Sequence, residues 1–291
     1  MAQLSVHHFE RMRDALVQLR DRLAAYAVPY GSEPQPGSVG EADIKTFSRP
    51  ESVHTAQSQA WILVEVTSDQ LTAFIKTVTE PVETVAPYTC VRSLLEGAAL
   101  ACWLFDPAVE VADRVARSIA LRYEGMLQQL RWARAAGEDP ARAERRLADI
   151  ATMATSLGYR PILDKSGRHA GAGQHLPSVT DLIGTTLNEE EHYRLLSAVA
   201  HGHHWALQQL SFDRAPRFDT SSGLSGARLS GLTKAANVTA FALFTLISAR
   251  AFARTIWYQA LYLGWDQTRL RELLEEVFDL LGARDELRFW R

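Results

Sequence analysis

The sequence is poor in cysteine, in net charge and in long apolar runs. Its 291 residues include only two cysteines, Cys90 and Cys102. Both fall in one predicted helix, where twelve residues correspond to about 18 Å of rise. A disulfide requires Cα atoms within roughly 7 Å of each other. We therefore expect two free thiols and a reducing compartment, which favours a cytoplasmic location.

Charge and hydropathy argue against a nucleic-acid-binding, secreted or membrane-spanning protein. The formal net charge of -3 lacks the basic excess that domains binding nucleic acid or membrane surfaces usually carry. The first residues, MAQLSVHHFERMRD, lack the basic and apolar regions of a secretory signal. The longest uncharged run, residues 235–249, is shorter than the roughly 20 residues that span a bilayer. We interpret this run as part of a core helix and expect no membrane association.

Period-two alternation, the pattern of strands, is also missing, and the helical period takes its place. The first segment repeats apolar residues at spacings of three and four, namely Phe9, Met12, Leu16, Leu19, Leu23 and Tyr26. The pattern predicts further helices at about 52–79, 83–106, 109–136, 140–157, 178–185, 188–212, 230–263 and 266–281. We therefore predict an all-α fold, a helical bundle of about eight or nine helices.

Proline and glycine divide the chain into three parts. Pro29 ends the first helix, and no periodicity continues through the prolines and glycines that follow. We predict an N-terminal helical arm at 1–28, a linker loop at 29–50 and an all-α helical domain at 51–291. The arm either packs on the body of its own chain or exchanges with a second copy.

The stretch YRLLSAVAHGHHW, residues 193–205, holds three of the nine histidines. We predict that Asn188 caps its helix, with Glu191 completing a capping box. At 100° per residue, one polar stripe collects a set of side chains from this helix: Arg194, Ser197, His201, Trp205 and Gln208, with His204 at the edge. On the opposite, apolar side fall His192 and His203, which we expect to be core histidines.

A second informative stretch is VRSLLEGAALACWLF, residues 91–105, which is apolar on all sides except for Arg92 and Glu96. A helix of this kind is buried, and the i,i+4 spacing lets the two charges pair. Burying charges is costly, so the pair is a candidate binding site. The alternative is an ion pair with a purely structural role.

The polar stripe also allows two other chemistries, a serine–histidine pair and a metal site. Ser197 and His201 are also four residues apart, so the histidine could act as a base on the hydroxyl. One regular helix offers no oxyanion hole, which argues against acyl transfer.

A metal site is the other alternative. His201 and His204 could share a cation with Glu96 or Glu124 from a facing helix. Bundle metal sites usually show Glu-x-x-His on two helices, and the clear match here is the single one at residues 189–192. We expect no metal and no cofactor.

The segment RLLSAVAHG, which begins at Arg194 and contains His201, resembles the R-x(4-6)-H signature of the HEPN superfamily of helical bundles. A VRSLLEGA-type helix followed by a Y-x-x-L-S-x-x-x-H-G helix is similar to a branch of uncharacterised bacterial helical proteins near that superfamily. The resemblance covers about residues 85–212.

Active HEPN proteins are metal-independent ribonucleases in which an arginine and a histidine from two protomers meet across a dimer interface. The resemblance therefore implies a homodimer with RNA or a nucleotide as its partner, in a defence or stress role. It implies that His201 activates the ribose 2′-hydroxyl and that Arg194 stabilises the phosphate charge, with Ser197 beside them.

Many members of the superfamily only bind nucleotides or partner proteins, so two further hypotheses stay open. One is an enzyme or binder of a small molecule or metal. Its candidate substrate-binding residues are Arg92, Glu96, His204 and Trp205. The other is a non-catalytic interaction or dimerisation protein whose first helix and motif helix form an interface.

Overall fold

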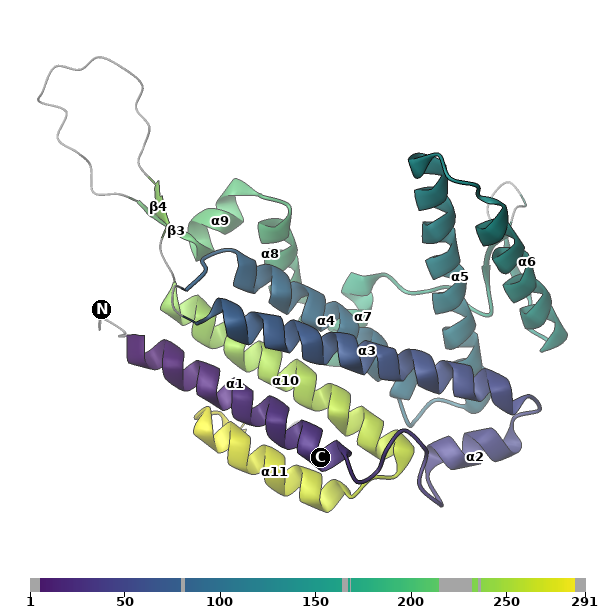
Figure 1. The fold of residues 1–291 in the computed structure, drawn as a ribbon, viewed down its shortest axis with the longest axis horizontal. Helices are drawn as coiled ribbons and strands as arrows, with labels where there is room; N and C mark the ends of the chain where they lie inside the picture. Colours follow the sequence, from purple (N-terminus) through teal and green to yellow (C-terminus); the bar gives the residue numbers. More distant parts are fainter. Residues whose placement is uncertain are drawn as a thin grey trace, which may run out of the picture.

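The computed structural model describes residues 6–79, 82–163, 167, 169–214, 232–234 and 237–285. These residues form an all-α helical bundle with eleven helices and two small two-stranded antiparallel sheets (Figure 1). The described residues form two more helices than the nine segments predicted from the sequence. One additional helix lies inside the expected linker, and the other arises because the expected helix at 188–212 is divided.

The helices in chain order are α1 (Val6–Ala27), α2 (Val39–Thr46), α3 (Pro50–Thr77), α4 (Ala86–Phe105), α5 (Val111–Ala136), α6 (Ala141–Ser156), α7 (Val179–Leu187), α8 (Glu190–Ala200), α9 (His204–Leu210), α10 (Val238–Leu263) and α11 (Gln267–Leu280). The strands pair as β1 (Pro161–Leu163) with β2 (His169–Ala172), and β3 (Phe212–Arg214) with β4 (Leu232–Lys234). The helix expected from residue 230 therefore begins later, at Val238, after a short strand.

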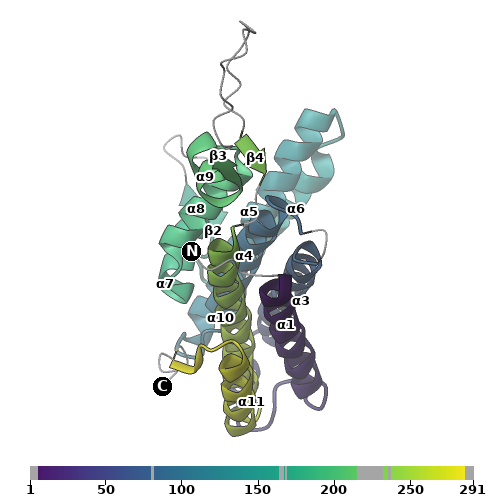
Figure 2. The same cartoon turned by 90° about the vertical axis from the view of Figure 1, so that its left-hand side faces the viewer.

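Helix α4 is the centre of the main core, as its apolar sequence predicts. It packs against α3, α10, α7 and α8 (Figures 1 and 2). The contact with α3 is close at Gly97, where an added Cβ would lie 2.8 Å from the Thr67 hydroxyl oxygen. A larger residue at this position would push the two helices apart.

Helix α1 packs on the body of its own chain, along α3, α10 and α11 (Figure 2). Its seam residues Leu16, Leu19 and Leu23 are fully buried. At the end of the helix, the Tyr26 hydroxyl donates a hydrogen bond of 2.9 Å to the backbone oxygen of Asp266. The alternating spacing of three and four residues thus serves a contact within the chain.

The segment 29–50 was expected to be a linker loop, and the structure corrects this. Helix α2 lies within it, capped by the Ser38 side chain, and its Asp43 is buried. The Arg114 guanidinium, only 1% exposed, donates to the Asp43 carboxylate over 2.9 Å and lies 4.3 Å from the Tyr262 ring centroid. Tyr262 donates to the same carboxylate over 3.0 Å. This buried ion pair anchors the segment to α5 and α10.

Helices α5 and α6 pair side by side and extend away from the bundle (Figure 1). They enclose a second, smaller core around Ile119, Leu147 and Ile150, which Val53 of α3 joins at the base. Helix α10 is long and apolar enough to cross a bilayer by length and composition, and most of its apolar stretch is buried inside the bundle. Its burial agrees with the expected core helix.

Candidate functional site

The histidine-rich motif lies at a break between two helices, where a single helix was expected. Helix α8 ends at Ala200, and Gly202 adopts a left-handed conformation with φ of 71°. The His203 amide donates to the Ala198 oxygen, and the Gly202 amide donates to the Val199 oxygen, each over 2.9 Å. This is a Schellman ending, which glycine allows without steric cost. The expectation was wrong because the glycine after His201 terminates the helix.

The beginning of α8 also differs from the prediction. Asn188 is left-handed, with φ of 58°, and closes α7 by donating its amide to the Gly184 oxygen. Glu189 occupies the N-cap position of α8 but makes no capping hydrogen bond through its side chain. The predicted capping box of Asn188 and Glu191 is therefore wrong. Only Asn188 and Glu189 lie between α7 and α8, and Asn188 serves the end of the first helix.

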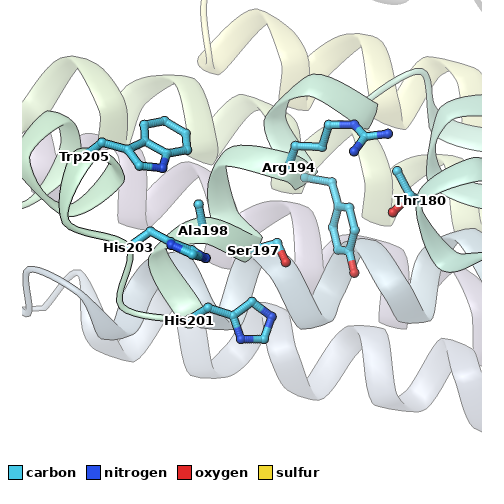
Figure 3. Close-up of a pocket in the computed structure, with 8 residues that line it drawn as sticks. Thr180, Arg194, Ser197, Ala198, His201, His203 and Trp205 are labelled. Atoms are coloured by element: carbon cyan, nitrogen blue, oxygen red, sulfur yellow. The ribbon is translucent and has the colours of Figure 1, made fainter.

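An open surface pocket of about 270 Å³ surrounds the break. Figure 3 shows side chains from α7, α8 and α9 around it. The pocket brings together four of the sequence-predicted site residues, Arg194, Ser197, His201 and Trp205. The remaining lining residues are Thr180, Tyr193, Ala198 and His203. His204 and Gln208 do not line this pocket, because the break turns α9 away from the direction of α8.

His201 and Arg194 are both accessible from solvent. His201 is exposed, and no hydrogen bond to its ring forms among the described residues. The His203 ring lies 6.4 Å away, centroid to centroid. Arg194 is 66% exposed and donates to one carboxylate oxygen of Glu190 over 2.9 and 2.8 Å. The ring nitrogens of His201 are thus available to exchange a proton with a bound molecule.

The predicted pair of Arg92 and Glu96 forms, with 2.8 Å between Nη2 and Oε1 and side chains 26% and 29% exposed. Tyr193 of α8 joins it by donating its hydroxyl to Glu96 over 2.7 Å and accepting from Arg92 over 3.3 Å. Burial raises the pKa of the Tyr193 hydroxyl, and the bond to Glu96 raises it further. The hydroxyl therefore stays protonated at neutral pH.

The pair reaches the pocket only through this tyrosine. Arg92 and Glu96 themselves do not line it. Sequence reasoning missed Tyr193, although its place four residues before Ser197 on the same helix was a usable signal. The three side chains fix α8 against α4 directly behind His201 and Arg194.

Glu189 forms a second buried cluster that sequence reasoning missed. Its carboxylate lies 2.7 Å from Nδ1 of His192 and contacts Nη2 of Arg250 on α10. The His192 ring packs edge-on against Phe244. The His192 side chain is 23% exposed, so its expected core position is confirmed only in part. His203 was expected in the core, but it is exposed and occupies the N-cap position before α9.

The described residues contain no group of three histidine, cysteine, aspartate or glutamate side chains placed to hold a metal ion. His204 does not join His201 in the pocket, and Glu96 is engaged by Tyr193 and Arg92. No protein-family model, curated protein or solved structure matches this chain. The residues that line the pocket are therefore the features of this chain that point to a function.

Proposed function

We propose that this is a HEPN-like protein that acts on RNA or nucleotides as a metal-independent ribonuclease, working as a homodimer in a defence or stress role. One observation carries the proposal. Arg194 and His201, the two residues of the R-x(4-6)-H pattern, line one open pocket with Ser197 between them. A base and a cation at one accessible surface are the groups that RNA cleavage without metal requires.

The reaction follows from the chemistry of these side chains. His201 accepts the proton of a ribose 2′-hydroxyl, and the oxygen attacks the adjacent phosphorus atom. The bond from phosphorus to the 5′-oxygen breaks, leaving a 2′,3′-cyclic phosphate and a 5′-hydroxyl end. Arg194 stabilises the negative charge that grows on the phosphate oxygens. Glu190 holds the guanidinium at the pocket wall, and the phosphate replaces this carboxylate when RNA binds.

A second copy completes the site in this proposal. The pocket is open and its arginine is mostly exposed, so a single chain supplies little to exclude water or protonate the leaving oxygen. Under two-fold symmetry, the same surface of the second copy faces the first. The partner's His201 then protonates the 5′-oxygen. Trp205, 53% exposed at the pocket edge, offers its ring to stack on a base.

Arg92, Glu96 and Tyr193 have a positioning role in this scheme. They hold α8 against α4 through a hydrogen-bonded ion pair, so the position of the helix that carries Arg194 and His201 depends on them. Of the three, only Tyr193 reaches the pocket.

Cleavage of an unstructured oligoribonucleotide in EDTA tests the proposal. We expect His201→Ala to reduce the rate by about 10²–10⁴-fold, the usual contribution of a general base, and Arg194→Ala to reduce it comparably. His204→Ala is the matched control, because this exposed histidine lies outside the pocket, and it should cleave like the wild type. An inert wild-type protein, or a His201→Ala variant as active as the wild type, would overturn the proposal.

Mixing wild type with His201→Ala tests the composite site. In a mixed dimer, each of the two sites keeps only one of the two histidines that the reaction uses, so both sites should be inactive. In an equimolar random mixture half of the dimers are mixed and a quarter are wild type, so the rate should fall to about half of that of the same amount of wild type alone. An unchanged rate from a mixture that forms mixed dimers would show that each chain carries its own complete site.

A further inference from the structure

A second cavity, of about 380 Å³, lies on α3 and shares no residue with the His201 pocket. The loop between α1 and α2, the end of α4 and the end of α10 form its other walls. These elements are at the opposite end of the bundle from α8 and α9 (Figures 1 and 2). Its volume falls in the range typical of small-molecule sites, about 300–1,000 Å³.

The floor of this cavity is apolar and fixed. Phe105 and Leu263, both almost completely buried, form its base. Trp61 forms one side, and the edge of its ring packs against Trp265 with 6.4 Å between centroids. Ile62 is exposed at the border. A flat apolar group can lie on this surface next to an indole ring.

The rim offers hydrogen-bond acceptors and negative charge. Glu33 lines it, and its carboxylate has no ion-pair partner among the described residues. The side-chain amide of Gln57 donates hydrogen bonds to the Tyr262 hydroxyl, at 3.1 Å, and to the Gly40 backbone oxygen, at 3.4 Å. The side-chain carbonyl oxygen of Gln57 accepts no hydrogen bond from the part of the chain that the structure describes.

The remaining polar lining residues are Ser32, His54 and Ser58. No lysine or arginine is among the described residues that line this cavity. The rim thus complements a group that donates hydrogen bonds and carries positive charge.

The loop that carries Glu33 is pinned on both sides. Before it, the Tyr30 ring stacks on Trp265, with centroids 5.3 Å apart and 13° between planes. After it, the Gln35 amide donates to the Leu263 oxygen over 2.8 Å. The Gln35 side chain also donates to the backbone oxygen of Glu33 over 3.3 Å. A ligand therefore meets a loop that is already ordered, which reduces the entropic cost of binding.

We propose that this cavity binds a small organic cation, a primary amine attached to a flat apolar body. The ammonium group pairs with Glu33 and donates to the Gln57 carbonyl oxygen, while the flat body rests on Phe105 and Leu263. The Trp61 ring adds attraction to the positive charge, as indole faces do for ammonium groups.

Calorimetric titration with tryptamine and with tryptophol, its neutral alcohol counterpart, tests the proposal. We expect tryptamine to bind about fivefold more tightly, which is the upper end of the range for a partly exposed ion pair. Glu33→Gln should remove this preference while leaving tryptophol binding unchanged. Glu272→Gln, which alters an exposed glutamate on α11, is the matched control and should keep the preference.

Two further variants complete the test. Trp61→Leu should weaken the binding of both ligands, because the flat body of each lies next to the Trp61 ring. His201→Ala should leave tryptamine binding unchanged, which separates this proposal from the ribonuclease proposal. Absence of tryptamine binding to the wild type at millimolar concentration would overturn the inference. Equal preference for tryptamine in wild type and Glu33→Gln would also overturn it.

Discussion

Removing one member of the buried pair Asp43–Arg114 should destabilise the protein strongly. Asp43→Ala leaves the Arg114 guanidinium, which is 1% exposed, without a carboxylate partner. Among the described residues, Asp43 holds the only carboxylate within hydrogen-bond distance of it. The substitution also removes the acceptor of the Tyr262 hydroxyl. Breaking a buried ion pair from one side costs about 3–5 kcal/mol. That is a large share of the roughly 5–15 kcal/mol by which domains are stable.

Arg114→Met should cost at least as much. Besides Asp43, the guanidinium donates to three backbone carbonyl oxygens, those of Leu104, Asp106 and Val109. These oxygens lose their donor when the arginine is replaced, and an unsatisfied buried polar group costs about 1–3 kcal/mol. The double variant Asp43→Ala/Arg114→Met should be no less stable than Arg114→Met alone, since Asp43 has already lost its ionic partner.

Urea unfolding followed by circular dichroism measures these differences in the free energy of unfolding. Glu144→Ala is the control, because the Arg134–Glu144 pair has a similar distance of 2.8 Å but side chains that are 60% and 49% exposed. It should cost less than about 1 kcal/mol. A cost of Asp43→Ala no larger than that of Glu144→Ala would contradict the predicted role of this ion pair, and so would additive effects of the two core substitutions.

Four further predictions concern the backbone, packing, thiol reactivity and titration. Gly202→Ala should lower the free energy of unfolding by about 1 kcal/mol, because residue 202 has a left-handed backbone. As a control, Gly125 has a helical backbone and open space around it, so Gly125→Ala should raise the free energy of unfolding by up to about 1 kcal/mol. Gly97→Ala should cost about 1–3 kcal/mol in urea unfolding because of its contact with Thr67, and part of this loss should disappear when Thr67→Ala is added. Burial raises the pKa of the Cys102 thiol from 9.0 to about 12, so iodoacetamide at pH 8 should not modify Cys102 until the protein unfolds. Because burial also raises the pKa of Tyr88 and Tyr262 in the folded state, unfolding curves should show stability falling as pH rises above about 9–10; unchanged stability up to pH 11 would contradict this assignment.

Local periodicity predicted the features that depend on residues close in sequence. The seam of α1 and the apolar surface of α4 both follow from helical spacing. The pairing of Arg92 with Glu96 follows from their separation of four residues on one helix. In each case, the information needed for the prediction lies within one or two helical turns.

Features that depend on distant contacts were missed. The Asp43–Arg114 pair joins positions 71 residues apart, and it orders a segment whose prolines and glycines indicated a loop. Tyr193 reaches Glu96 across 97 residues. Gly202 was a local signal for the end of a helix. The helical spacing of apolar residues continues on both sides of this glycine, so the pattern predicted one unbroken helix. The break at Gly202 decides which histidines share the pocket, so His203 lines it while His204 does not.

The role of His201 is tested most directly by comparing an oligoribonucleotide with the same oligonucleotide carrying a 2′-deoxy sugar at the cleaved position, both in EDTA. A mechanism in which His201 activates the 2′-hydroxyl predicts cleavage of the ribonucleotide alone, with 2′,3′-cyclic phosphate and 5′-hydroxyl ends. It also predicts that His201→Ala leaves both oligonucleotides intact. Cleavage of the deoxy substrate at the same rate, or no cleavage of either by the wild type, would contradict it.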